Sequence, residues 1–418
     1  MAFLFFISSL LTYKRFLILW AVVGLLLSDS WVSVKSSATL TLLCAYGDYT
    51  FGVLALGGFV FSLFINRSNF RFRISLIEIL MILYLLMAIF SGIINHSTGL
   101  FYRTLKTAVA LGFGLSYIYA FSKKDWKYII YGLSFFGIVN LLMSYCIFLS
   151  GVFGIETPFP VSALYGNRNI FSKYLSIISA YFLIEFLLKR DKGKKFIHGV
   201  LLIAIFLGIL IQYSRSGYIE YFITSTIIVF LCGSKSIKKI ALIVLPMVLA
   251  LFVYFTIVRI ETDKMNIKNS SDIGRIYVLK AGINMIKAHP IRGIGYGMSE
   301  IRCNEFADKS LPGLFGLTSI HNWFIAVWAE MGILGLIVFC ALNYTLMHKS
   351  IKSVLKLGLF EGKQSFFVIN SLLVLLIEAF VQPNSDYQDI YWIIIAIGVI
   401  SLKSEKNTFQ KIRTVNYG

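Results

Sequence analysis

The chain has 418 residues, of which 58% are hydrophobic and 14% are charged, and its formal net charge is +19. Ordinary soluble domains carry about 25% charged residues, and a soluble core could not hide this much apolar surface from water. The composition excludes a soluble globular protein, a disordered chain and a disulfide-rich secreted domain. The solvent of most of this chain is therefore lipid.

Apolar segments long enough to cross a bilayer recur along the whole chain. A hydrocarbon core of about 30 Å needs about 20 apolar residues per helix. By this measure we predict an all-α, polytopic membrane protein with about twelve transmembrane helices, forming a single domain over residues 1–418. The predicted spans are 16–34, 48–66, 74–94, 105–122, 128–153, 169–188, 196–212, 217–233, 240–257, 320–347, 365–383 and 389–402.

The cationic side chains follow these spans in an alternating pattern. Of the 39 lysines and arginines, 24 fall in every second connection, including both ends of the chain. The opposite short connections hold six, Lys35, Arg103, Lys106, Arg168, Lys173 and Arg215, and the long segment 258–319 holds nine. Because positive charge in short loops marks the cytoplasmic side, we predict cytoplasmic termini and an outward-facing segment 258–319. Membrane topology thus accounts for the charge, and no nucleic-acid partner is expected.

The cysteines do not form a metal or disulfide pattern. Cys44, Cys146, Cys232, Cys303 and Cys340 are scattered, with no CxxC-like pair among them. We therefore expect neither a metal site nor a disulfide framework.

The outer segment 258–319, between spans nine and ten, contains one predicted helix. Ser271 and Asp272 are favoured helix caps, and His289-Pro290 should end the helix. Between them, apolar residues recur with helical spacing at Ile276, Leu279, Ile283 and Ile286. We expect an amphipathic helix along the outer membrane interface. The glycine run that follows, Gly293-Ile294-Gly295-Tyr296-Gly297, lacks the strand and helix of a dinucleotide fingerprint, so we predict a simple turn.

His321-Asn322 lie at the outer mouth of the tenth span, and Glu330 follows nine residues later. Ionisable residues at membrane depth are candidates for function, although His321 could also be an interfacial histidine with satisfied ring nitrogens. Glu330 lies about 13 Å further along the helix at 1.5 Å per residue, which argues against a direct His–Glu pair. We expect Glu330 to hold another helix or an arginine.

Arginines also occupy the short outer connections. Arg215, in Ser214-Arg215-Ser216-Gly217, must lie at or inside the membrane face and needs an anion there. That anion could be a lipid phosphate, an acid such as Glu220, or a substrate phosphate gripped by the guanidinium fork. Arg168 with Lys173, and Arg103 with Lys106, form two further outer clusters. Together they indicate an anionic ligand at the bilayer surface, for which a lipid diphosphate is well suited.

The ordered set of these motifs resembles the O-antigen ligase family, which includes ligases of lipopolysaccharide assembly and related Wzy-type polysaccharide polymerases. The resemblance is concentrated in residues 200–340. The motifs that carry it are Ser214-Arg215-Ser216-Gly217, Gly274-Arg275, His289-Pro290 with the glycine run, and His321-Asn322 with Glu330-Met331-Gly332-Ile333-Leu334-Gly335.

The resemblance implies a glycosyltransferase that uses no metal and no cofactor, on the periplasmic side of the bacterial inner membrane. Its implied partners are an undecaprenyl-diphosphate-linked glycan as donor, lipid A–core as acceptor, and membrane lipids. By position, the essential histidine of the family corresponds to His321, as base, and its two essential arginines to Arg215 and Arg275, on the leaving diphosphate. Arg168, Lys173 and Arg292 are further candidates for the diphosphate, and Asn322 and Glu330 for orienting the site.

Two alternatives remain open from the sequence. A polymerase that joins undecaprenyl-linked repeat units would need the same donor site and would differ in its acceptor. A transporter or flippase would need charged groups deep in several spans, for which Glu78, Glu220 and Glu378 are candidates. It would also often show paired halves, and the sequence has no such repeat.

Overall fold

The computed structural model describes residues 74–97, 100–122, 125–155, 157, 161–162, 167–189, 191–264, 271–307, 319–380 and 389–415. These residues form helices and their connections, without strands. The predicted spans 16–34 and 48–66 lie outside the described residues. The helices are α4 (Leu76–Ile94), α5 (Leu100–Ala120), α6 (Trp126–Val152), α7 (Arg168–Leu188), α8 (Lys192–Ile211), α9 (Arg215–Cys232), α10 (Lys235–Lys264), α11 (Ser271–Ala288), α12 (Cys303–Phe306), α13 (Trp323–Glu361), α14 (Lys363–Ala379) and α15 (Asp389–Val415).

Each predicted span from 74–94 onward coincides with one of these helices, and the predicted outer helix is α11, which ends directly before His289-Pro290. Six described helices are long and apolar enough to cross a membrane, namely α4, α6, α7, α8, α10 and α13. The described part of the chain is therefore all-helical, and its apolar helices indicate a membrane protein. The number of twelve spans and the orientation of the termini stay predictions.

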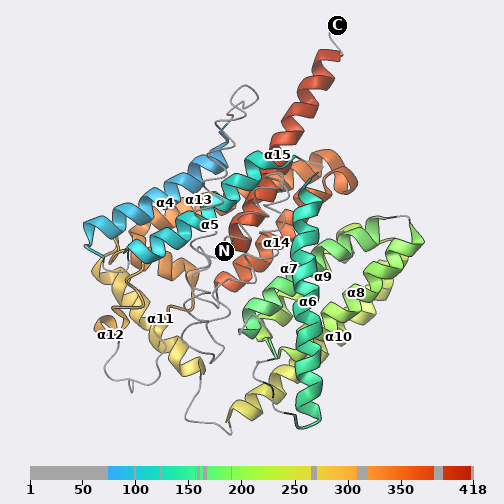
Figure 1. Cartoon of the computed structure of the whole chain (residues 1–418), viewed down its shortest axis with the longest axis horizontal. Helices are drawn as coiled ribbons and strands as arrows, with labels where there is room; N and C mark the ends of the chain where they lie inside the picture. Colours follow the sequence, from blue (N-terminus) through green and yellow to red (C-terminus); the bar gives the residue numbers. More distant parts are fainter. Residues whose placement is uncertain are drawn as a thin grey trace, which may run out of the picture.

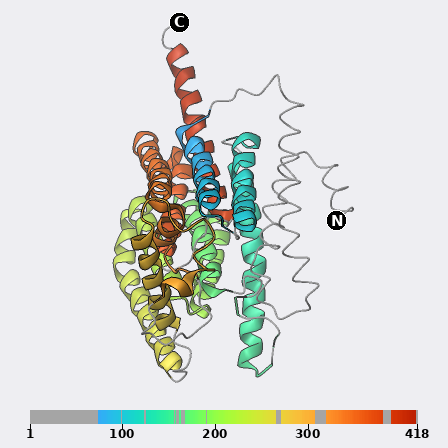
Figure 2. The same ribbon diagram turned by 90° about the vertical axis from the view of Figure 1, so that its left-hand side faces the viewer.

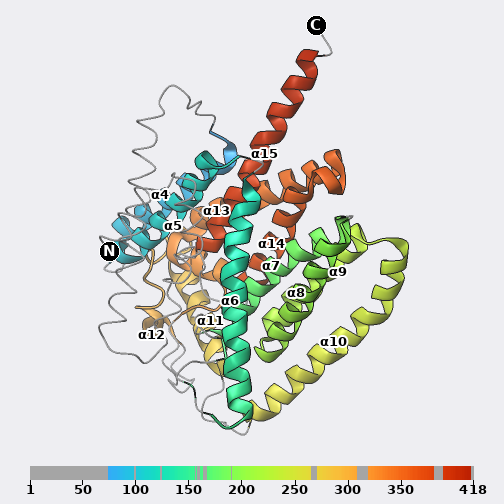
Figure 3. The same ribbon diagram turned by 45° about the vertical axis from the view of Figure 1, so that its right-hand side comes forward.

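The centre of the bundle is α7, on which every residue from 171 to 182 is buried. It packs against α6, α8, α9 and α14, while α4 and α5 pack against α13 and α15 (Figures 1 and 3). Small residues permit the closest approach, as they do between membrane helices generally. Gly217 of α9 packs on Ser172 of α7 so closely that an added Cβ would lie 2.3 Å from the Cβ of Ser172.

Ion pairs connect neighbouring helices at one side of the bundle. Lys403 of α15 lies 2.8 Å from Glu78 at the start of α4, and Lys363 of α14 lies 2.8 Å from Glu185 near the end of α7. The opposite side carries α11 and α12, away from the C-terminal end of α15 (Figures 1 and 2). The starts of α5, α7, α9 and α13 belong to that opposite side, where the candidate residues lie.

α13 is broken at Gly332, where φ is +71° and ψ is −175°. The break exposes backbone groups that must find partners in an apolar setting. The segment after α11 supplies them: Ile294 N–H donates to Ala329 O at 2.8 Å, and Gly295 N–H donates to Glu330 O at 3.1 Å. The glycine run is thus more than the simple turn we predicted. It supplies hydrogen-bond donors to the carbonyl groups at the break in α13. The N–H groups of Ile294 and Gly295 are therefore not free to bind phosphate.

Gly332 is required by this contact, because an added Cβ would lie 1.8 Å from the carbonyl oxygen of Ile291. We predict that Gly332→Ala lowers the stability of the protein by about 3 kcal/mol or more, from the positive φ and the backbone clash together. Gly358→Ala is the matched control, because Gly358 has a φ of +74° in the same helix with open space around it. It should cost about 1–3 kcal/mol from the positive φ alone, without a clash. Thermal unfolding in detergent measures both, and equal losses would contradict the clash.

Candidate active site

His321 directly precedes α13 and is held between two buried neighbours. Ile320 and Trp323 are each 1% exposed, and the ring of Trp323 packs against Phe339 and Tyr391. Asn322 is the N-cap of α13, since its side-chain oxygen accepts from the N–H of Ile325 at 3.0 Å. The backbone of His321 is therefore fixed by the buried side chains of Ile320 and Trp323. We predicted that Asn322 orients the site, and in the structure it caps the start of α13.

Arg275 lies on α11, which runs beside the start of α13. Gly282 of α11 packs on the residues that flank His321, and an added Cβ there would lie 2.9 Å from both Ile320 and Ile325. The segment after α11 then meets α13 at Gly332, so the two helices run in the same direction. Arg275 is half-buried and lies about two turns before Gly282 along α11.

Arg168 and Arg215 are the first residues of α7 and α9, which begin side by side. Ser214 caps α9 by accepting from Gly217 N–H at 3.1 Å, and it donates its hydroxyl to Asn169 at 2.8 Å. Two helix N-termini, each beginning with an arginine, therefore lie side by side. Both features favour an anion, because the N-terminal end of a helix carries a partial positive charge.

The remaining cations predicted for the diphosphate lie elsewhere. Lys173 is 1% exposed, and its Nζ lies 2.7 Å from Glu378 of α14, so its charge is neutralised inside the bundle. Arg292 is exposed in the turn after α11, where its backbone carbonyl accepts from Ser91 at 3.3 Å. The structure thus groups Arg168 with Arg215, buries Lys173 and leaves Arg292 on the segment that follows α11.

The C-terminal end of α14 connects the arginines of α7 and α9 to the start of α13. Glu378 pairs with Lys173, one turn into α7, and the ring of Phe380 lies 5.0 Å from that of Phe324, in the first turn of α13. The beginnings of α7, α9 and α13 therefore lie at the same end of the bundle. His321, Arg168 and Arg215 share that end.

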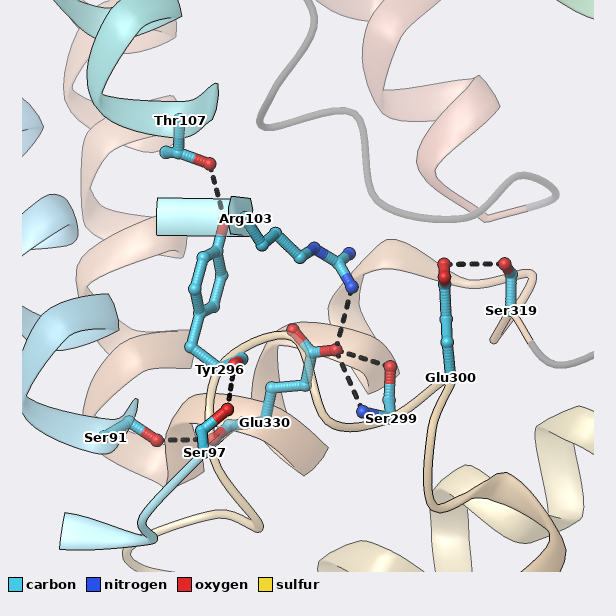
Figure 4. Close-up of polar contacts among 9 residues, drawn as sticks. All are labelled: Ser91, Ser97, Arg103, Thr107, Tyr296, Ser299, Glu300, Ser319 and Glu330. Carbon is cyan, nitrogen blue, oxygen red and sulfur yellow. Dashed lines mark hydrogen bonds and ion pairs between the residues drawn. The ribbon is translucent and has the colours of Figure 1, made fainter. Parts of the chain in front are cut away.

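Glu330 is completely buried and connects three segments (Figure 4). Its carboxylate lies 3.2 Å from the guanidinium of Arg103 on α5, and it accepts from both the backbone N–H and the hydroxyl of Ser299. Arg103 also lies 5.6 Å above the ring of Tyr296, whose hydroxyl bonds to Thr107 at 2.7 Å. Glu330 therefore holds an arginine, as we expected, and joins α13 to α5.

The same network continues toward His321. Glu300, next to Ser299, accepts from the hydroxyl of Ser319 at 2.6 Å, and Ser319 lies two residues before His321 (Figure 4). Ser299 and Glu300 thus lie along the first turns of α13, where Ser299 bonds to Glu330 and Glu300 bonds to Ser319. These two contacts help to position the backbone that carries His321.

His289 is the second histidine of this region. Its pKa is lowered, first because burial disfavours the charged ring and then because Arg292 and Arg302 are close. The ring is therefore neutral near pH 7.

No cluster of three or more metal-binding side chains occurs among the described residues.

Residues 200–340 match the family model described as O-antigen ligase. This confirms the resemblance inferred from the motifs. No curated protein matches the chain. The O-antigen ligase match runs from α8 to the first part of α13 and so includes Arg215, Arg275, His321 and Glu330.

Several residues of the site lie outside the matched segment or were not assigned to it from the sequence. Arg103 was recognised only as part of an outer cluster, and its pairing with Glu330 spans 227 residues of sequence. No sequence pattern predicted a role for Ser299 and Glu300, apart from their place after the glycine run. Their roles depend on how α5, α11 and α13 pack, which no local pattern encodes.

The buried pair Arg103–Glu330 makes a prediction for stability. Glu330→Gln removes the partner of a guanidinium that is only 11% exposed, and it should destabilise the protein by about 3 kcal/mol. Glu305→Gln is the matched control, because Arg302 and Glu305 form an exposed pair at 2.7 Å. Exposed pairs contribute about 0–1 kcal/mol, so this variant should unfold at nearly the wild-type temperature. Equal thermal shifts for the two variants would contradict the anchoring role of Glu330.

Proposed function

We propose that the protein is an O-antigen ligase of the bacterial inner membrane, which transfers a glycan from undecaprenyl diphosphate to a sugar hydroxyl of lipid A–core. The active site would face the periplasm. The observation that carries this proposal is the O-antigen ligase match over residues 200–340, which contains His321, Arg215 and Arg275. The geometry supports it, because His321 and Arg215 lie at the same end of the bundle and Arg275 lies on the helix beside α13.

The proposed chemistry is a direct displacement at the anomeric carbon of the donor. His321 takes the proton of the acceptor hydroxyl, whose oxygen forms a bond to C1. The bond between C1 and the diphosphate oxygen breaks, and its electron pair leaves with the diphosphate. Arg215 and Arg275 stabilise the charge that develops on that oxygen. A single displacement inverts the configuration at C1 and needs neither metal nor cofactor.

The donor requires a polar end and an apolar end, and the described surface has both. Arg168 would join Arg215 on the diphosphate where α7 and α9 begin. Arg292, which lies on the segment after α11, is a further candidate. Lys173 is left out of this site because Glu378 already neutralises it. The undecaprenyl tail needs an apolar surface, and α10 exposes large apolar side chains, including Ile243 at 68% and Met247 at 66%.

The proposal is tested by transfer in vitro, with purified full-length protein, undecaprenyl-diphosphate glycan, lipid A–core and EDTA. His321→Ala should lower the rate by at least about 100-fold, because a general base contributes about 10²–10⁴-fold. Arg215→Ala and Arg275→Ala should each lower it by about 10²–10³-fold, the loss typical of one stabilising group.

His348→Ala and Arg302→Ala are the matched controls. His348 is exposed on the same helix, and Arg302 pairs on the surface with Glu305. Both variants should transfer at the wild-type rate. Normal transfer by all three site variants would refute the proposed site, and inhibition by EDTA would refute the metal-independent mechanism.

The acceptor distinguishes a ligase from a polymerase, which would use the same donor site. We predict that cells lacking the gene lose all O-antigen from lipopolysaccharide while undecaprenyl-linked polymer still accumulates. Lipopolysaccharide gels and extracted lipid-linked glycan measure the two pools. Core that carries a single repeat unit would instead identify a polymerase.

A further inference from the structure

Three ionisable side chains from three helices meet inside the bundle, and the proposed reaction uses none of them. They are Lys173 of α7, Glu220 of α9 and Glu378 of α14, which are 1%, 0% and 2% exposed. The ammonium of Lys173 lies 2.7 Å from Glu378. Glu220 interacts electrostatically with both, and among the described residues neither of its carboxyl oxygens has a hydrogen-bond partner.

These side chains lie near one end of the bundle rather than at its middle. Lys173 and Glu220 each follow the first residue of their helix by five positions, or about 7.5 Å at 1.5 Å per residue. Glu378 is the second-last residue of α14. The cluster therefore lies directly behind Arg168 and Arg215. Its position differs from the midplane site that a transporter typically places between its repeats.

The charges of the cluster do not balance if every group is ionised. Two carboxylates and one ammonium leave one negative charge in an apolar interior, where an uncompensated charge costs several kcal/mol. Lys173 already pairs with Glu378 at hydrogen-bonding distance. Among the described residues, Lys173 and Glu378 are the charged groups that act on Glu220 from the helices packed against α9. A proton on Glu220 removes the imbalance without any further partner.

We propose that Glu220 is a proton-binding site, which holds its proton at neutral pH while Lys173 and Glu378 beside it form an ionised pair. The ligand is the proton itself, and the site is built by α7, α9 and α14. The proposal does not depend on the glycosyltransferase activity. It predicts that folding takes up one proton at this position, since an exposed glutamate in the unfolded chain has a pKa of about 4.3 and is ionised at neutral pH.

Thermal unfolding of the full-length protein in detergent, from about pH 6 to about pH 9, tests this directly. Because the folded state then binds one proton more than the unfolded state, its stability falls as the pH rises. Glu220→Gln is neutral without a proton, so its Tm should exceed that of the wild type. The difference should widen by about 1–3 °C for each pH unit until the wild-type proton is lost.

Glu185→Gln is the matched control, because Glu185 is equally buried but already forms ion pairs with Lys189 and Lys363. Its Tm should be below that of the wild type at every pH. A Glu220→Gln protein that is less stable than the wild type by the same amount at every pH would overturn the proposal.

Infrared spectroscopy provides a second measurement, which does not depend on how the variants unfold. The wild type at neutral pH should show the carbonyl stretch of a buried protonated carboxyl group. Glu185→Gln should retain this band, and Glu220→Gln should lose it. A wild-type spectrum without the band would overturn the proposal even if Glu220→Gln failed to fold.

Discussion

The buried contact between Glu330 and Arg103 is the interaction on which the arrangement of the site depends. A carboxylate without water must find its donors within the protein, and those of Glu330 come from α5 and from the segment after α11. The position of that segment then determines two further contacts. Its glycines close the break in α13 at Gly332, and Glu300 reaches Ser319, two residues from His321. One buried acid thus sets the relative positions of α5, α11 and α13.

Other buried acids follow the same rule at the ends of helices. Glu78 pairs with Lys403, Glu185 with Lys363, and Glu378 with Lys173, so each connects helices that are distant in sequence. In a chain with only 14% charged residues, each of these ion pairs uses an acid near the end of α4, α7 or α14 to join two helices. Glu220 departs from the rule, since its carboxyl has no hydrogen-bonded cation among the described residues. With a proton bound, it leaves the region behind Arg215 electrically neutral.

The helices could be predicted from the sequence because the requirement of a bilayer is local: about 20 apolar residues, then a polar break. The end of α11 before His289-Pro290 and the place of His321 before α13 followed in the same way. The contacts between helices could not be predicted from the sequence. Lys173 was expected beside Arg168 because it lies one turn later, but α7 turns this side chain inward, against Glu378. The glycine run was read as a turn, because its partner at Gly332 lies on another helix.

The pair Glu78–Lys403 has a consequence for how the protein is made. It joins the first described helix to the last one, across 325 residues of sequence. At a synthesis rate of about 5–20 residues per second, α4 emerges roughly 15–65 s before Lys403 exists. During this interval the buried face of α4, which includes Glu78 and Tyr84, has no access to α15. The early helices must therefore remain in the insertion machinery or in lipid with Glu78 bonded, among the described residues, only to Ser75 of its own helix cap and to Tyr119 of α5. The bundle can close only when the last helix arrives.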